Sequence, residues 1–251
     1  ILSPTPRTRN TTMPAKDSKA AVASVALITG AVLLTLGVTL LALRKREKKK
    51  SSQGAEDSAT ASTPRVIFVL GGPGSGKGTQ CSLIEAEKSF GYAHLSAGDL
   101  LRAERNSGSE LADMINEYIR EGKIVPAEVT VGLLRKAMEL SGKSRFLIDG
   151  FPRNVDNLAA WEASTAGGEV VVDFALFLDC PEDVMTARIL QRSLSSGRID
   201  DNEDAIRKRL VTYRESTMPI IQQFAARGKM REVNSDQSVG KTKAKSKNHA
   251  S

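Results

Sequence analysis

The residues of this chain with the clearest chemistry are the glycine-rich run GGPGSGKGT, residues 71–79. It directly follows the apolar segment Val66–Leu70, opens a helical pattern and matches the spacing G-x-x-x-x-G-K. Glycines let backbone N–H groups wrap anionic oxygens, a helix N-terminus adds a positive dipole, and Lys77 adds a full charge. The run therefore predicts a nucleoside triphosphate site rather than a plain surface turn. The expected phosphate-binding residues are Gly74, Ser75, Gly76, Lys77, Gly78 and Thr79.

The residue after Lys77 bears on the metal ion that accompanies a triphosphate. A hydroxyl at that position normally contacts Mg²⁺, but here it is Gly78, with Thr79 one residue later. We expect Mg²⁺ to be held without a direct protein ligand, through water, with Asp149 as an outer partner. The alternative for Asp149 is a structural cap of the following turn.

Short apolar runs alternate with helical patterns along the middle of the chain. Strands are predicted at Val66–Leu70, Phe146–Ile148 and Val170–Leu178, with weaker candidates at His94–Ser96 and Arg231–Asn234. Helices are predicted at residues 76–90, 97–105, 109–121, 127–141, 154–164, 181–193 and 202–227. This alternation is typical of a parallel sheet covered by helices. We predict a P-loop α/β fold of three layers, α/β/α, with a central five-stranded parallel sheet, whose ligands bind beyond the carboxyl ends of the strands.

Composition and charge exclude several classes of protein. The chain of 251 residues carries a net charge of +7, but residues 64–236 hold 22 Lys/Arg and 25 Asp/Glu. The globular part therefore lacks the basic field of a nucleic-acid-binding domain, and aromatic residues, at 4%, are too scarce for a base-stacking surface. Two cysteines cannot form a disulfide framework, and we read Cys81 and Cys180 as packing residues.

Residues 20–43 contain no charged side chain. As a helix they would reach about 36 Å, enough to span the roughly 30 Å hydrocarbon core. Six Lys/Arg lie at 44–50, against four in residues 1–19, which predicts that the C-terminal side faces the cytosol. We expect a transmembrane anchor; a cleaved signal peptide, a buried core helix and an organelle transit peptide are the alternatives. Without the anchor, the protein would be soluble and cytoplasmic.

These features divide the chain into five parts. Residues 1–19 form an N-terminal tail, 20–43 the anchor, and 44–63 a basic stop and flexible linker. Residues 64–239 form the globular domain, and the lysine-rich residues 240–251 are expected to be a disordered tail.

Several motifs in order resemble the nucleoside monophosphate kinase (adenylate kinase) family, and within it the UMP–CMP kinases with a short lid. The resemblance covers about residues 66–239. It rests on GGPGSGKGTQC (71–81), HLSAGDLLRAE (94–104), EGKIVP (121–126), FLIDGFPRNVDN (146–157) and SSGRIDDN (195–202). It implies ATP and UMP or CMP as substrates, Mg²⁺ with ATP, a role in pyrimidine nucleotide synthesis and a monomeric kinase domain.

The resemblance also implies an acceptor site in a region at about residues 96–126. Arg102 and Arg153 would clamp the acceptor phosphate, since guanidinium groups bind phosphate bidentately. Asn157 would read the pyrimidine with its amide, which offers both a donor and an acceptor; an exposed helix turn is the alternative for this residue. The remaining residues expected at this site are Lys123, Ile124, Val125, Gly150, Phe151 and Pro152.

The polar segment 192–202 resembles the mobile lid of the family. Arg192 and Gln237 are expected on the ATP side, while Arg198 and Arg209 would bridge donor and acceptor and stabilise the charge of the transition state. The acidic pair Asp200-Asp201 would hold the lid arginines, or would simply lie in a solvated loop. With Lys77 and Arg153, Arg198 and Arg209 are the expected catalytic residues.

Two departures from the family pattern affect the surroundings of the site. Ser193 and Leu194 stand where a hinge glycine and a lysine are usual. From Gly240 on, the chain becomes rich in lysine, where a final packed helix is usual. The reaction expected is reversible transfer from ATP to UMP or CMP. An adenylate kinase, or a membrane-tethered nucleotide-binding module with weak activity, are the competing hypotheses.

Overall fold

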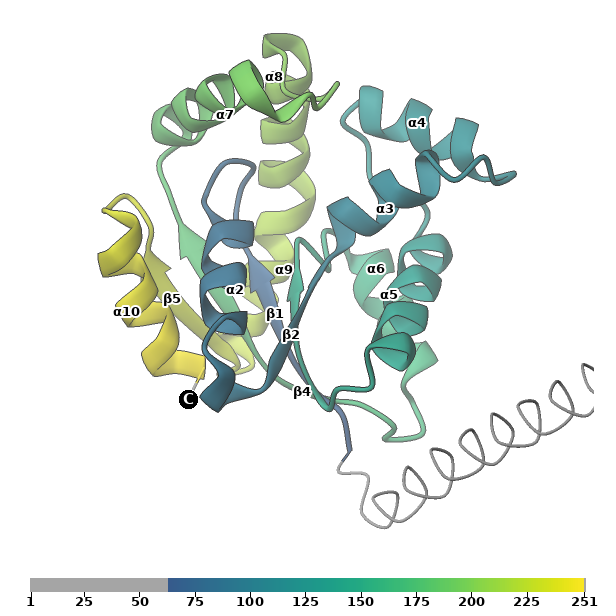
Figure 1. The fold of residues 1–251 in the computed structure, drawn as a ribbon, viewed down its shortest axis with the longest axis vertical. Helices are drawn as coiled ribbons and strands as arrows, with labels where there is room; N and C mark the ends of the chain where they lie inside the picture. Colours follow the sequence, from purple (N-terminus) through teal and green to yellow (C-terminus); the bar gives the residue numbers. More distant parts are fainter. Residues whose placement is uncertain (1–62, 251) are drawn as a thin grey trace, which may run out of the picture. The chain divides into compact units, whose positions relative to one another are not determined.

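The computed structural model describes residues 63–250 (Figure 1). The predicted anchor at 20–43, together with the segments on either side of it up to residue 62, lies outside the described residues. Among residues 63–250, none of the helices has both the length and the apolar character needed to cross a membrane.

Five parallel strands form the central sheet, in the order β2-β3-β1-β4-β5. Their bounds are β1 Arg65–Leu70, β2 Tyr92–Ser96, β3 Arg145–Asp149, β4 Val171–Asp179 and β5 Met230–Asn234. The prediction of a five-stranded parallel sheet is confirmed, including both weaker strand candidates. Because all strands run in the same direction, the residues that follow them collect at one edge of the sheet.

The helices connect and cover these strands (Figure 1). The α-helices are α2 Lys77–Glu85, α3 Ala97–Arg105, α4 Ala112–Arg120, α5 Ala127–Ser141, α6 Val155–Ser164, α7 Glu182–Ser196, α8 Glu203–Thr212, α9 Met218–Ala226 and α10 Val239–Ala250. A short 3₁₀ helix, η1, spans Lys88–Phe90, and a π-helical turn, η2, spans Tyr213–Thr217.

Strand β1 shows how the sheet separates two apolar cores. Val66, Phe68 and Leu70 join a core with α5, α6 and α9, while Ile67 and Val69 point to the opposite face, toward α2 and α10. The alternation follows from the two-residue period of a strand, and the apolar residues on both sides explain why its sequence reads as a continuous apolar run. The predicted three layers are therefore present.

The C-terminal segment corrects the sequence analysis. Residues 240–251 were expected to be a disordered tail without a packed helix, but Val239–Ala250 form α10, which lies against α2 and β5 (Figure 1). Thr242, Ser246 and Ala250 recur every four residues and are buried, so a face of small side chains packs inward although large apolar residues are lacking. Lys247 lies outside this face and pairs with Glu87, with 2.6 Å between Nζ and Oε2. The globular domain thus extends past residue 239.

The segment predicted to be a lid, residues 192–202, is partly helical. Residues 192–196 continue α7, and only the segment from Gly197 to Asn202 leaves the helix. Gly197 adopts φ of 61°, a left-handed conformation that ends the helix and that glycine adopts without a steric cost. The absence of a hinge glycine at Ser193 is consistent with this continuation.

Candidate active site

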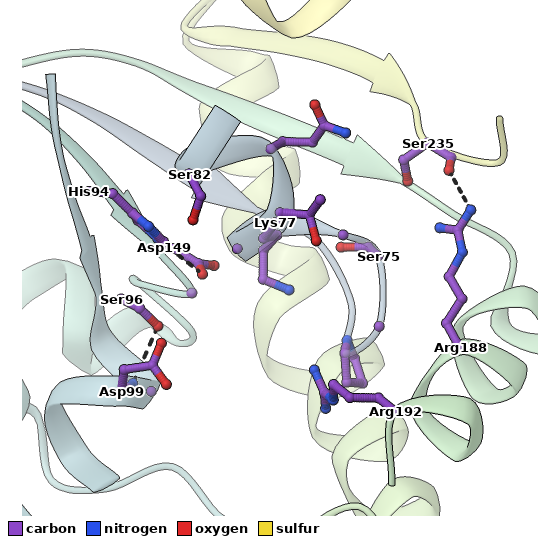
Figure 2. A pocket seen from close by; sticks show the side chains of 18 of the residues that line it. Ser75, Lys77, Ser82, His94, Ser96, Asp99, Asp149, Arg188, Arg192 and Ser235 are labelled. Atoms are coloured by element: carbon purple, nitrogen blue, oxygen red, sulfur yellow. Dashed lines mark hydrogen bonds and ion pairs between the residues drawn. The ribbon is translucent and has the colours of Figure 1, made fainter. Parts of the chain in front are cut away.

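A cavity of about 610 Å³ lies beyond the carboxyl edge of the sheet (Figure 2). Residues following all the strands except β4 contribute to its wall, together with α7 and α8. Seven lining side chains are cationic and two are carboxylates, so the cavity is built for an anion. The cationic residues are Lys77, Arg102, Arg153, Arg188, Arg192, Arg198 and Arg209, and the carboxylates are Asp99 and Asp149.

The loop between β1 and α2 forms one wall of the cavity, with Gly74, Ser75, Gly76, Lys77, Gly78 and Thr79 all lining it. Gly74 has φ of 83°, and a Cβ there would lie 2.4 Å from the carbonyl oxygen of Met185. Glycine is thus required both by the backbone conformation and by the close approach of α7. Gly76, with φ of 92°, precedes α2, so the helix N-terminus faces the cavity.

Lys77 is the buried cation of this loop. Its Nζ donates to the carbonyl oxygens of Gly71 at 2.9 Å and Gly72 at 2.8 Å. Burial, opposed by Asp149 and reinforced by the positive charge of Arg153, lowers the pKa of Lys77 from 10.5 to about 8. A bound phosphate would supply the negative partner that stabilises the charged form of this lysine.

Arg153 follows the end of β3, where Asp149 and Gly150 turn the chain toward the cavity. Its Nε donates to the carbonyl oxygen of Gly150 at 2.9 Å. Burial lowers the pKa of Arg153 to about 10, and the charge of Arg209 acts in the same direction. The Phe151–Pro152 peptide bond in this turn is cis. Two guanidinium groups held close together in a buried site are suited to bind an anion between them.

A small pocket beside Arg153 contains Asn157, the residue expected to read the base. Asn157, on α6, is 2% exposed, so the alternative of an exposed helix turn is wrong. Its Oδ1 accepts a hydrogen bond from the backbone N–H of Arg153 at 3.1 Å, while its buried Nδ2 has no partner among the described residues. A buried donor without a partner calls for an acceptor from a ligand. The other lining residues are Ala97, Leu101, Ile124, Val125, Thr130, Gly150, Phe151 and Arg153.

Two other residues expected at the acceptor site lie close to this pocket without lining it. Lys123 lines an adjoining hollow together with Arg102 and Arg209. Pro152 lines a third small cavity, beside Lys77 and Tyr213. The structure therefore places both around the same region.

Buried carboxylates hold the arginines of α7 and α8. Asp201 accepts hydrogen bonds from Arg192 Nη2 at 2.6 Å and Nε at 2.8 Å, and it lies 3.3 Å from Nη1 of Arg209. Asp200 Oδ2 lies 2.9 Å from the same Nη1. Burial opposes ionisation of Asp201, yet the hydrogen bonds from Arg192 hold its pKa below the usual value. The alternative of a solvated loop for these two acids is wrong, because they are 4% and 3% exposed.

Arg102 and Arg198 share a third carboxylate, Asp99, which was not among the predicted site residues. Asp99 Oδ1 lies 2.5 Å from Nη2 of Arg102 and 3.4 Å from Nη2 of Arg198. The contact joins α3 to the segment after α7. The spacing of three residues between Asp99 and Arg102 on one helix was a signal for the first pair, but nothing in the sequence indicated the second.

The far end of the cavity is lined by residues after β5 and by α7. Gln237, expected there, donates from Nε2 to the carbonyl oxygen of Asn234 at 2.7 Å. Arg188, which was not predicted, donates to the carbonyl oxygen of Ser235 at 3.0 Å (Figure 2). Its position four residues before Arg192 puts both on one face of α7, a signal that was available in the sequence.

Asp149, the last residue of β3, lies beside the phosphate loop and is 8% exposed. Its Oδ2 lies 3.6 Å from Nε2 of His94 (Figure 2). A Cβ on Gly78 would lie 3.5 Å from the same oxygen, so the loop passes close to this carboxylate. Within residues 63–250, His, Cys, Asp and Glu side chains form no group of three able to enclose a metal ion.

Comparisons with known proteins agree with this geometry. The family model for adenylate kinase matches residues 69–229. The chain is 55% identical over 183 residues to UMP-CMP kinase 3 of Arabidopsis thaliana, covering 72% of this chain and 87% of that protein. It is 50% identical over 191 residues to UMP-CMP kinase of Danio rerio, covering 74% of this chain and 96% of that protein. The chain therefore belongs to the adenylate kinase family of nucleoside monophosphate kinases.

Proposed function

We propose that this protein is a UMP–CMP kinase, which transfers a phosphoryl group reversibly from ATP to UMP or CMP. The observation that carries the proposal is Asn157, whose buried amide faces a small pocket beside the arginine expected to clamp the acceptor phosphate. An amide can pair with the donor and acceptor pattern of a pyrimidine edge. The names of the similar proteins from Arabidopsis thaliana and Danio rerio support the same substrates.

The chemistry needs positioning and charge rather than a general base, because the attacking acceptor phosphate is already an anion. Lys77, Arg153 and Arg209 line both the large cavity and the small cavity beside it, and donor and acceptor phosphates would meet near these three cations. Charge spreads over the equatorial oxygens during transfer, and fixed cations there stabilise the transition state more than the substrates. Arg198 and Arg192 approach from the side of α7 and would complete this arrangement.

Mg²⁺ fits the residues present as an ion bound mainly by ATP and water. Mg²⁺ keeps several waters and commonly binds through one or two carboxylates plus substrate phosphates. Asp149 supplies one buried carboxylate on the cavity wall, next to the position where Gly78 replaces the usual hydroxyl. When bound, Mg²⁺ would neutralise phosphate charge; Asp149 would hold its water ligands.

A coupled assay on the full chain tests the function directly. We expect faster turnover of UMP and CMP than of AMP, with Arg153→Ala reducing transfer by at least about 1000-fold, in line with the loss of an essential arginine in other phosphoryl-transfer enzymes. Fastest use of AMP would indicate an adenylate kinase instead. Binding of ATP without turnover of any nucleoside monophosphate would favour a nucleotide-binding module.

We also propose that residues 20–43 anchor the protein in a membrane, with the kinase domain on the cytosolic side. The support is the length of the uncharged segment and the cluster of Lys/Arg that follows it. The full chain should remain in the membrane fraction after extraction at alkaline pH, while deletion of residues 20–43 should release it. Release of the full chain would contradict an integral anchor.

A further inference from the structure

A π-helical turn interrupts the long helix made by α8, η2 and α9. The turn, Tyr213–Thr217, begins directly after Thr212, the last residue of α8. Such turns add one residue to a helix and occur frequently at functional sites. This one lies against the reaction region, because Thr212, Tyr213 and Thr217 line the small cavity that also contains Lys77 and Arg153.

Two threonines at the ends of this turn reach two separate backbone segments. Thr217 Oγ1 donates a hydrogen bond to the carbonyl oxygen of Arg153 at 2.9 Å. Thr212 Oγ1 lies within hydrogen-bonding distance of two carbonyl oxygens, that of Gly122 at 3.0 Å and that of Lys208 at 3.1 Å. Both contacts cross long stretches of sequence, of 64 and 90 residues.

The π turn explains how both hydroxyls reach the same region. In a regular α-helix each residue advances about 100°, so residues five apart point in directions about 140° apart. In a π turn the backbone hydrogen bonds run between residues five apart, so each residue advances by a smaller angle and residues five apart point in more similar directions. Thr212 and Thr217 are therefore brought toward one side of the helix, the side that faces the acceptor segments.

The two segments belong to the acceptor site rather than the ATP site. Gly122 immediately precedes Lys123–Val125, which line the hollows beside Arg102 and Asn157. Arg153 donates its backbone N–H to Asn157 Oδ1 and is held by Thr217 through its carbonyl oxygen. Neither threonine lines the large cavity that extends to the far, ATP-side end.

We propose that Thr212 and Thr217 are positioning residues for the acceptor nucleotide. By fixing the backbone of Arg153 and of Gly122, the π turn sets the separation between the phosphate clamp, the base-reading amide and the opposite pocket wall. The proposal rests on the proposed function, since it assigns these pockets to the acceptor.

Steady-state kinetics of the full chain with Thr217→Val tests the proposal. Valine keeps the side-chain shape but removes the donor, and loss of one neutral hydrogen bond corresponds to roughly a fivefold effect. We expect the KM for UMP to rise about fivefold while the KM for ATP changes less than twofold, and Thr217→Ser to restore the value. Thr212→Val should show the same selectivity. Thr186→Val is the matched control, because Thr186 makes a hydrogen bond only within α7, to Glu182, and should leave both KM values unchanged.

The outcomes separate this proposal from the proposed function. A thermal unfolding transition shows whether each variant is folded. For a folded variant, equal shifts in the KM for UMP and for ATP, or no shift in either KM, would overturn the positioning role. Calorimetric binding of UMP to the same variants gives a second measurement that does not depend on turnover, and unchanged affinity there would also overturn it. If the unmodified chain phosphorylates neither UMP nor CMP, the proposed function itself fails.

Discussion

Removing the charge of Lys77 is expected to stabilise the nucleotide-free protein while abolishing its response to ATP. Burial lowers the pKa of this lysine from 10.5 to about 8. One pKa unit corresponds to about 1.4 kcal/mol, so the charged amine destabilises the folded state by roughly 3 kcal/mol at neutral pH. Lys77→Met removes this term. It also removes the two donations to the carbonyls of Gly71 and Gly72, which contribute about 1 kcal/mol each.

The net expectation is a gain of about 1 kcal/mol, or a rise in Tm of about 2–4 °C for a domain of this size. The destabilisation caused by the charged Lys77 depends on pH. Below pH 8 the lysine is charged in both states and the destabilisation is complete. Between pH 8 and 10.5 the folded state has lost the proton that the unfolded state still binds, so the destabilisation diminishes. The advantage of Lys77→Met should therefore decrease in that range.

Urea unfolding at pH 7 and pH 9.5, with and without ATP, measures these effects. The unmodified protein should gain stability from ATP by mass action, and Lys77→Met should gain little. Lys88→Met is the control, because Lys88 is exposed and its replacement should change stability by less than about 0.5 kcal/mol. A Lys77→Met variant that is less stable at pH 7, with a deficit independent of pH, would show that burying the charged amine does not destabilise the folded state.

Three further changes test other parts of the site. Gly74→Ala and Gly76→Ala both force an alanine to positive φ, but only the alanine at position 74 meets the Met185 carbonyl. Thermal unfolding should therefore show a larger loss of stability for Gly74→Ala, at least about 2 kcal/mol, than for Gly76→Ala, about 1 kcal/mol. Asp201→Asn should lower kcat by up to about 100-fold by misplacing two arginines, measured in the coupled assay. Asn157→Ala should raise the KM for UMP about tenfold with little change for ATP; equal effects on both substrates would contradict base reading.

The sheet and the phosphate loop could be predicted because their signals are local. A strand buried on both faces needs a continuous apolar run, as in Val66–Leu70, and the loop needs its glycines in a fixed spacing. The gathering of Arg102, Arg153 and Arg209 in one cavity was implied by the family resemblance. The fold accounts for it, because each lies after or near the carboxyl end of a parallel strand or on a helix that returns to that edge.

The parts that escaped prediction depend on partners distant in the sequence. The small residues of α10, such as Ser246, give no apolar period, and they form a helical face only because α2 lies close enough to cover them. The contact between Asp99 and Arg198 crosses 99 residues, and that between Thr217 and Arg153 crosses 64. Hydrogen bonds between residues this far apart produce no periodic pattern in the sequence from which they could be predicted.

The partners of the cations divide them into two groups with different freedom to move. Arg192 and Arg209 are held by Asp200 and Asp201, which are almost fully buried and therefore remain in place when a ligand enters. Arg102 and Arg198 share Asp99, whose side chain is 60% exposed, so water can solvate this carboxylate if a phosphate replaces it. The first group can present fixed charge where the phosphoryl group is transferred, and the second can turn toward an arriving acceptor. The four carboxylates Asp99, Asp149, Asp200 and Asp201 offset only part of the charge of the seven cations, so the empty site retains a positive charge that favours phosphate. It stays open to phosphate because only the exposed carboxylate has to be displaced.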